Sequence, residues 1–203
     1  MKDNYFKKTL GSGLVLESAF GVQNSVYADV LQVRIGNDPR FEFDKYSHHY
    51  LLRSNSEPVG SMTITRNVDG PFDCQAMYPR SLFKEFGPSL ISTCKFRVTK
   101  GTHNSFGTLR SLIREVWRHQ TRDGMRLDLI NSTVENVRFY KRIGYTPINN
   151  SEFRHPTLGT QSVAMFMATD PSVRSFIQKQ CEALSDPLRR STVQKVVYAP
   201  SNN

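Results

Sequence analysis

The chain has 203 residues, 38% of them hydrophobic, and a formal net charge of +9 at neutral pH. This composition is typical of a soluble single-domain protein, and no apolar run is long enough for a membrane-spanning helix. The charge favours an acidic partner, yet no zinc finger, RNA-binding motif or basic tail indicates nucleic acid. The three cysteines, Cys74, Cys94 and Cys181, lack metal-ligand spacing, which predicts no metal site and a reducing, cytoplasmic compartment.

The first quarter of the chain predicts an arm, a helix and an antiparallel hairpin. Residues 1–24 are expected to form an N-terminal arm or to contribute a first strand at 14–16, and a helix follows at 24–34. Residues 50–53 and 59–66 are rich in strand-forming types and flank a turn, which predicts the hairpin. Glu42 and Asp44 precede it, either facing a site at the end of the sheet or lying in a solvated loop.

The residues from 67 to 90 are rich in proline and predict a long connection with one short helix at 81–86. Its apolar side chains either line a ligand cavity or form a small core of their own: Met77, Leu82, Phe83, Phe86 and Leu90.

The central part of the chain, from 94 to 145, predicts a strand at 94–98, a polar loop, a helix at 108–122 and a strand at 127–130. This order is typical of parallel strands joined by a crossover helix. The helix has one apolar stripe for packing on a sheet: Leu109, Leu112, Ile113, Val116 and Trp117. Its N-terminus after Gly107 is either a site for an anion or an ordinary turn.

The last part of the chain predicts a helix that starts at 131–133 with Ser132 or Thr133 as its cap, and that places Val137, Tyr140 and Ile143 on an apolar face. A loop at 149–160, a strand at 162–168 and a helix at 171–184 follow. We expect one domain from 25 to 185 and a flexible tail from 186 to 203.

The order of elements and the segment Phe139-Tyr-Lys-Arg-Ile-Gly-Tyr145 resemble the GNAT N-acyltransferase superfamily. The resemblance implies an α/β fold with a twisted mixed sheet flanked by helices, and Tyr140 as the acid that protonates a leaving thiolate. It also implies that the donor thioester and its phosphate bind at Lys95, Phe96, Arg97, Val98, Asn104, Ser105, Phe106, Gly107 and Thr108. The loop before Thr108 departs from the family's glycine pattern for coenzyme A pyrophosphate, which leaves room for an acyl carrier protein as donor.

The segment from Phe41 to Arg53, with Glu57-Pro-Val-Gly-Ser61 after it, is similar to the N-acyl amino acid synthases related to acyl-homoserine-lactone synthases. Glu42 and Asp44 match the first two acids of their motif, and Lys95 matches an arginine. Ser47 and Thr63 replace an aspartate and an arginine of the lactone synthases, which argues against lactone synthesis. The resemblance covers residues 25–170 and includes the late segment Phe153-Arg-His-Pro-Thr-Leu-Gly159.

These resemblances imply transfer of a fatty acyl group from a carrier-protein or coenzyme A thioester to the amine of an amino acid. Glu42 or Asp44 would take the amine proton, directly or through water, and backbone N–H groups at 96–98 would stabilise the thioester oxygen. No metal or tightly bound cofactor is expected. Arg110, Arg114 and Arg118 either dock the acidic carrier or form a solvated helix face. The alternatives are a coenzyme A-dependent acetyltransferase and an inactive binding module of the same fold.

Overall fold

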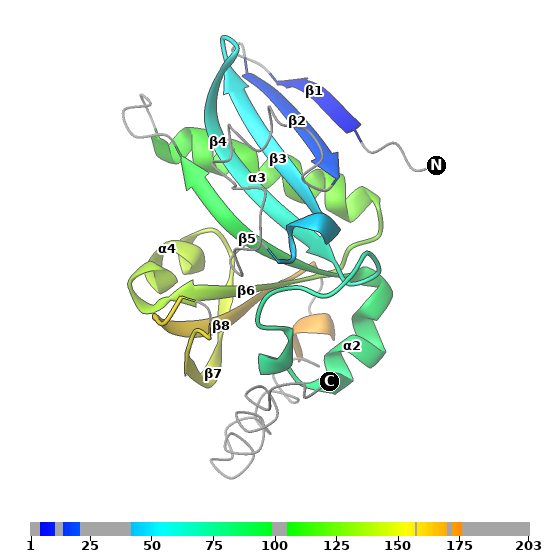
Figure 1. Ribbon diagram of the computed structural model, residues 1–203, viewed down its shortest axis with the longest axis vertical. Helices are drawn as coiled ribbons and strands as arrows, with labels where there is room; N and C mark the ends of the chain where they lie inside the picture. Colours follow the sequence, from blue (N-terminus) through cyan, green and yellow to red (C-terminus); the bar gives the residue numbers. More distant parts are fainter. Residues whose placement is uncertain are drawn as a thin grey trace. The chain divides into compact units, whose positions relative to one another are not determined.

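The computed structural model describes residues 5–10, 14–20, 42–98, 105–156, 158–169 and 172–175 (Figure 1). The chain divides into two compact units: unit 1 comprises residues 1–72 and 91–125, and unit 2 comprises residues 73–90 and 126–203. The helix predicted at 24–34 and the tail lie outside the described residues, as does the predicted C-terminal helix except for its turn at 172–175. No helix among the described residues is both long and apolar enough to span a membrane.

Unit 1 contains an antiparallel sheet in which neighbouring strands follow the order of the chain. Its strands are β1 (Tyr5–Leu10), β2 (Leu14–Phe20), β3 (Ser47–Ser54), β4 (Glu57–Arg66) and β5 (Leu90–Val98). The strand expected at 14–16 is thus confirmed and longer, and a second strand precedes it.

The predicted hairpin is confirmed as β3 and β4, but its strands begin earlier, at Ser47 and Glu57. The turn is only two residues long, because Asn55 and Ser56 both have positive φ angles of 49° and 71°. Such a turn matches the right-handed twist of the paired strands. A bulge between Leu52 and Arg53 then shifts the register, so that Leu52 pairs with Gly60.

Helix α3 (Ser105–Arg122) lies along one face of this sheet (Figure 1) and packs on β4. The predicted apolar stripe is confirmed where side chains are described, because Leu112, Ile113 and Val116 are buried. The helix begins at Ser105, which corrects the expected loop through Gly107. A glycine in the first turn costs little, since the N–H groups there have no partner within the helix in any case.

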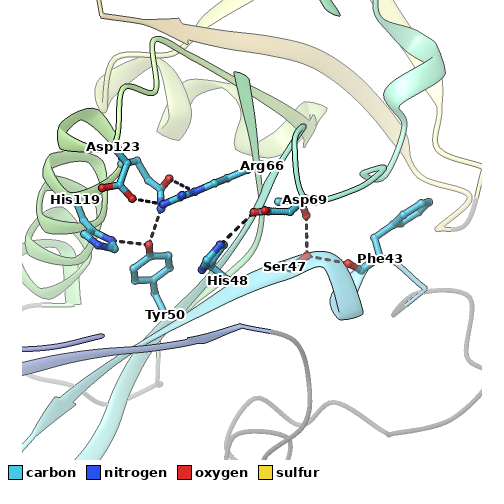
Figure 2. Close-up of polar contacts among 10 residues, drawn as sticks. Phe43, Ser47, His48, Tyr50, Arg66, Asp69, His119 and Asp123 are labelled. Carbon is cyan, nitrogen blue, oxygen red and sulfur yellow. Dashed lines mark hydrogen bonds and ion pairs between the residues drawn. The ribbon is translucent and has the colours of Figure 1, made fainter. Parts of the chain in front are cut away.

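A polar network closes the contact between α3 and the sheet (Figure 2). Gln120 Nε2 donates to Tyr50 Oη, so the Tyr50 hydroxyl donates in turn to His119 Nδ1 at 2.8 Å. Arg66 donates through Nε to Gln120 Oε1 at 3.0 Å and also forms an ion pair with Asp123. Burial raises the pKa of Tyr50 to about 12, so its proton stays in place.

Unit 2 contains the antiparallel strands β6 (Leu127–Thr133), β8 (Gln161–Ala168) and β7 (Thr146–Arg154), with β8 in the middle. Two predictions here are wrong. Residues 131–133 continue β6 instead of starting a helix, because their side chains alternate in burial and Ser132 faces the interior. Residues 149–154 belong to β7 instead of a loop, since a bulge with Asn150 at φ 54° absorbs the turn-like sequence.

The helix after β6 is short: the 3₁₀ turn η5 (Val134–Asn136) leads into α4 (Val137–Arg142). Thr133, one of the two predicted caps, occupies the N-cap position of η5, but its side chain makes no capping hydrogen bond. The predicted apolar face is confirmed, since Val137, Tyr140 and Ile143 pack on a buried cluster of Ile130, Tyr145, Val163 and Met165.

The connection in unit 2 carries η3 (Gln75–Met77), α2 (Arg80–Phe86), which confirms the predicted short helix, and η4 (Gly87–Ser89). Leu82, Phe86 and Leu90 are buried, whereas Met77 and Phe83 are half-buried. Tyr78 Oη donates to the carbonyl of Ile130 in β6 at 2.8 Å. These contacts favour packing over a cavity lining for the three buried side chains.

We expect the unfolding free energy to fall in acid because of His48. Burial first, and Arg66 second, lower its pKa from 6.5 to about 4, although Asp69 at 3.2 Å opposes the shift. Its neutral form therefore stabilises the fold above pH 6.5, and this contribution is lost as the pH falls toward 4. When the pH falls from about 7 to 5, the free energy of unfolding in urea should decrease by about 2 kcal/mol more for the wild type than for His48→Gln. Equal losses in both proteins would contradict this assignment.

Candidate functional site

The carboxylate of Asp44 is the most buried acidic group that the sequence singled out. It lies in the 3₁₀ turn η2 (Asp44–Tyr46) just before β3, and the residue is 2% exposed. Lys95 Nζ forms an ion pair with its Oδ1. Within the described part of the chain, its Oδ2 has no hydrogen-bond partner. Glu42 lies in the preceding turn and is exposed, so the two predicted acids have different surroundings.

His49 holds this turn against the sheet. Its Nε2 lies 3.2 Å from the carbonyl oxygen of Asp44, which only accepts, so Nε2 carries the proton. Its Nδ1 therefore accepts from the hydroxyl of Thr63 at 3.1 Å. Burial lowers the pKa of His49, which keeps the ring neutral at physiological pH. No role was predicted for His49 from the sequence, although it belongs to the segment that carries the resemblance.

A β-bulge places Lys95. In the ladder between β4 and β5, Thr63 pairs with Cys94 and Ser61 pairs with Arg97, so β5 has one extra residue here. Lys95 takes a left-handed conformation with φ 50°. A non-glycine residue in this conformation is uncommon, and such residues gather at functional sites. The bulge thus directs Lys95 to Asp44 instead of continuing the regular alternation of the strand.

Ser47 and Thr65 extend the polar row from His49 and Thr63 along the same face of the hairpin. Their hydroxyls are 2.7 Å apart, and Ser47 also donates to the carbonyl of Phe43 at 2.9 Å (Figure 2). All four side chains are buried. Asp44 and Lys95 therefore lie beside hydroxyl and imidazole groups, a setting suited to a polar substrate group.

Tyr140, the predicted acid, lies in α4 of unit 2 and is half-buried. Its ring contacts Tyr145 edge to face, with centroids 5.7 Å apart, and contacts Phe139 in the same manner at 5.1 Å. These contacts and the core beneath fix the ring in place. Packing within unit 2 therefore fixes the position of the Tyr140 hydroxyl.

The predicted donor-binding residues lie in β5 and at the start of α3. Phe96 is half-buried, and the backbone of Arg97 and Val98 continues the strand. Ser105, Phe106, Gly107 and Thr108 form the first turn of α3, and the last two are half-buried. Asn104 lies outside the described residues.

The predicted docking arginines Arg110, Arg114 and Arg118 are all exposed on α3. Glu115, which is buried beneath them, lies 2.7 Å from Arg118 and 3.6 Å from Arg114. Its other oxygen contacts Lys8 of β1 at 2.5 Å. One buried acid therefore faces three cations, and the surface of this helix keeps a net positive charge.

The comparisons with known proteins fit this architecture. Residues 19–168 match the family model described as N-acyl amino acid synthase FeeM. FeeM from uncultured soil microbes is 14% identical, with 84% of this chain and 95% of that chain covered at a TM-score of 0.60.

The acyl-homoserine-lactone synthase LasI is also 14% identical, with 84% and 97% covered and a TM-score of 0.51. An acyl-CoA N-acyltransferase from Pseudomonas aeruginosa is 11% identical, with 76% and 99% covered and a TM-score of 0.51. No curated protein matches in sequence. The structural likenesses show the fold and confirm the predicted GNAT-type α/β class.

We expect Lys95→Met to destabilise the protein, because it leaves the Asp44 carboxylate buried without its cation. The loss should be about 2 kcal/mol, less than for a fully buried pair because the Lys95 side chain is 22% exposed. Adding Asp44→Asn to Lys95→Met should recover most of this loss. Chemical denaturation of the two single variants and the double variant measures the coupling, and strictly additive effects would show that the pair does not interact.

Proposed function

The chain belongs to the N-acyl amino acid synthase FeeM family and is an N-acyltransferase, and we propose that it acylates the amine of an amino acid with a fatty acyl group from an acyl carrier protein. The observation that carries the proposal is the buried Asp44 carboxylate, which has one oxygen on Lys95 and the other without a partner among the described residues. A charged pair of this kind matches a substrate that carries both an ammonium group and a carboxylate.

Asp44 is the group we assign to the amine. The Lys95 side chain is partly exposed, so the pair is reached from the Lys95 side. An acceptor ammonium can replace Lys95 Nζ at the carboxylate, and Lys95 is then able to pair with the acceptor carboxylate. Asp44 takes one amine proton, directly or through a water molecule, and the neutral amine attacks the thioester carbon. His49 holds the backbone of Asp44 during this exchange.

The thioester carbonyl gains negative charge as the amine attacks. Backbone N–H groups of β5 at 96–98 are the donors we assign to this oxygen. As the tetrahedral intermediate collapses, the C–S bond breaks and the thiolate leaves with the electron pair. Tyr140 gives this thiolate its proton, and the second proton that the nitrogen loses returns to Tyr140 through water, while Asp44 releases its own proton to solvent. No covalent bond between the acyl group and the enzyme is required.

An acyl carrier protein is the donor we favour, because it is acidic and α3 exposes a row of arginines. The first turn of α3 is suited to the single phosphate of phosphopantetheine, since helix N-termini bind anions. A coenzyme A thioester is the alternative donor. It carries a pyrophosphate and an adenosine, and the sequence before Thr108 lacks the glycines that the family uses to bind the pyrophosphate.

Mass spectrometry of lipid extracts from cells that overexpress the chain tests the reaction itself. We expect new long-chain N-acyl amino acids relative to an empty vector, which would identify the acyl chain and the acceptor together. Asp44→Asn and Tyr140→Phe should each lower the product about 100-fold, as is typical for loss of an acid or base. Tyr140→Phe keeps the aromatic contacts with Tyr145 and Phe139, so it should fold like the wild type. A wild-type circular dichroism spectrum would attribute its lost activity to the missing hydroxyl.

Glu42→Gln is the matched variant for the base. If it removes activity while Asp44→Asn does not, Glu42 is the base and the assignment of Asp44 is wrong. Absence of new N-acyl amino acids in the wild type would favour the coenzyme A acetyltransferase, which binding of acetyl-coenzyme A would then test.

Charge reversal on α3 tests the carrier protein. We expect Arg110→Glu with Arg114→Glu to raise KM for an acyl carrier protein about tenfold and to leave kcat nearly unchanged, because docking acts before the chemistry. The same protein should use acyl-coenzyme A as before. Arg138→Glu with Arg142→Glu, two exposed arginines on α4, is the matched control. Equal effects of the two pairs would contradict a specific docking face on α3.

A further inference from the structure

Unit 2 brings together three metal-ligating side chains that the sequence keeps far apart: Asp73, Cys74 and His155. The first two stand at the start of the connection before η3, and His155 follows the end of β7. His155 Nε2 lies 3.0 Å from Asp73 Oδ2 and 3.4 Å from Cys74 Sγ. Cys74 Sγ lies 3.5 Å from Asp73 Oδ1. The catalytic proposal uses none of these groups.

The separations come close to those of a tetrahedral metal site, with Asp73 offering one carboxylate oxygen to His155 and the other to Cys74. Zinc binds sulfur at about 2.3 Å and nitrogen or oxygen at about 2.0–2.2 Å, so two ligands of one tetrahedral ion lie roughly 3.3–3.6 Å apart. All three ligand atoms here lie within 4.8 Å of one another. Only small side-chain movements are needed for them to share one cation.

Burial and backbone geometry support the same arrangement. His155 is 4% exposed and its ring stacks on Phe153, which fixes its direction. Cys74 takes a left-handed conformation with φ 57° and ψ 20°. The Asp73 side chain is 37% exposed, so one side of the cluster is open to water.

We propose that Asp73, Cys74 and His155 bind a first-row divalent transition metal, Zn²⁺ above all, with water as the fourth ligand. The combination of thiolate, imidazole and carboxylate selects zinc over magnesium or calcium, which take oxygen ligands alone. The metal fastens the connection that carries α2 to the end of β7 within unit 2. The site keeps one position open to water, and it is independent of the proposed acyl transfer.

Metal binding changes the protons of the cluster in a defined way. Without metal, Leu158 N–H donates to His155 Nδ1 at 3.2 Å, so the ring proton is on Nε2 and faces Asp73. When Nε2 binds the metal, this proton moves to Nδ1, and the Leu158 N–H has to turn away. Leu158, Gly159 and Thr160 are exposed, so the Leu158 N–H can bind water once it has turned away. The Cys74 thiol releases one proton to solvent.

The test uses the full chain without an affinity tag, kept reduced, stripped of metal and titrated with Co²⁺ and Zn²⁺. We expect one Co²⁺ per chain with a sulfur-to-cobalt charge-transfer absorption, which Zn²⁺ displaces. Cys74→Ser should abolish this absorption, and His155→Asn should weaken binding at least tenfold. Zinc should raise the melting temperature of the wild type but not of the two variants. In amide NMR spectra, the Leu158 resonance should shift on addition of Zn²⁺.

Cys94→Ser is the matched control, because Cys94, the other cysteine among the described residues, lies outside the cluster. Its Co²⁺ absorption should equal that of the wild type. The proposal is overturned if the wild type binds no stoichiometric metal, if Cys74→Ser keeps the absorption, or if Cys94→Ser loses it. Should Cys74→Ser fail to fold, the same Co²⁺ titration of His155→Asn decides, since unchanged affinity would exclude His155 as a ligand.

Discussion

A carboxylate that is buried beside a sheet has to be paired, and the pairing of Asp44 with Lys95 organises unit 1. Burying an isolated charge costs several kcal/mol, on the order of what a whole domain has in net stability. The sheet meets this requirement by an extra residue in β5, which brings Lys95 to Oδ1, and by His49, which ties the Asp44 carbonyl to Thr63. Three strands and one turn therefore depend on a single acidic group. A core built for stability alone would place an apolar side chain there, so the charged pair indicates a function that needs charge.

The two faces of the β3–β4 hairpin differ: one packs against α3, and the other carries the polar row beside Asp44. Tyr50 and His48 point to the side of α3, where Gln120, His119 and Arg66 complete a chain of hydrogen bonds (Figure 2). Adjacent residues in a strand face opposite sides, so His49 and Ser47 lie on the other face with Asp44. The network on the first face locks α3 to the sheet through Tyr50, Arg66 and Gln120. The second face keeps one carboxylate oxygen of Asp44 without a partner among the described residues, which supports our proposal that the acceptor amine binds on this face.

The sequence predicted those features that depend on neighbours along the chain. The apolar spacing in α3, the hairpin and the apolar face of α4 follow from local periodicity, which is why they were confirmed. The β-bulges could not be predicted from the sequence. They changed the register of the β3–β4 hairpin and turned the predicted loop at 149–154 into a strand. Counting outward from Asn55-Ser56 without a bulge pairs His49 with Met62, whereas the bulge pairs it with Thr63 and creates the link to Asp44. The bulge in β7 made a strand resemble a loop, because its asparagines and serine are typical of turns.

The spacing of the cysteines predicted no metal site, whereas the fold brings together ligands that are distant in the sequence. Motif analysis counts ligands that are close in sequence, but Cys74 and His155 meet only because η3 and the end of β7 lie together in unit 2. A carboxylate, a thiol and an imidazole in mutual contact need no cation to be satisfied, since the hydrogen bonds between them already pair each group. What distinguishes a metal site is that its distances suit a shared central ion as well as they suit hydrogen bonds. Asp73, Cys74 and His155 come close to that condition, whereas the Asp44 carboxylate is already paired with the Lys95 ammonium. Unit 1 therefore uses a lysine to balance its buried acid, and unit 2 has the ligands to use a metal.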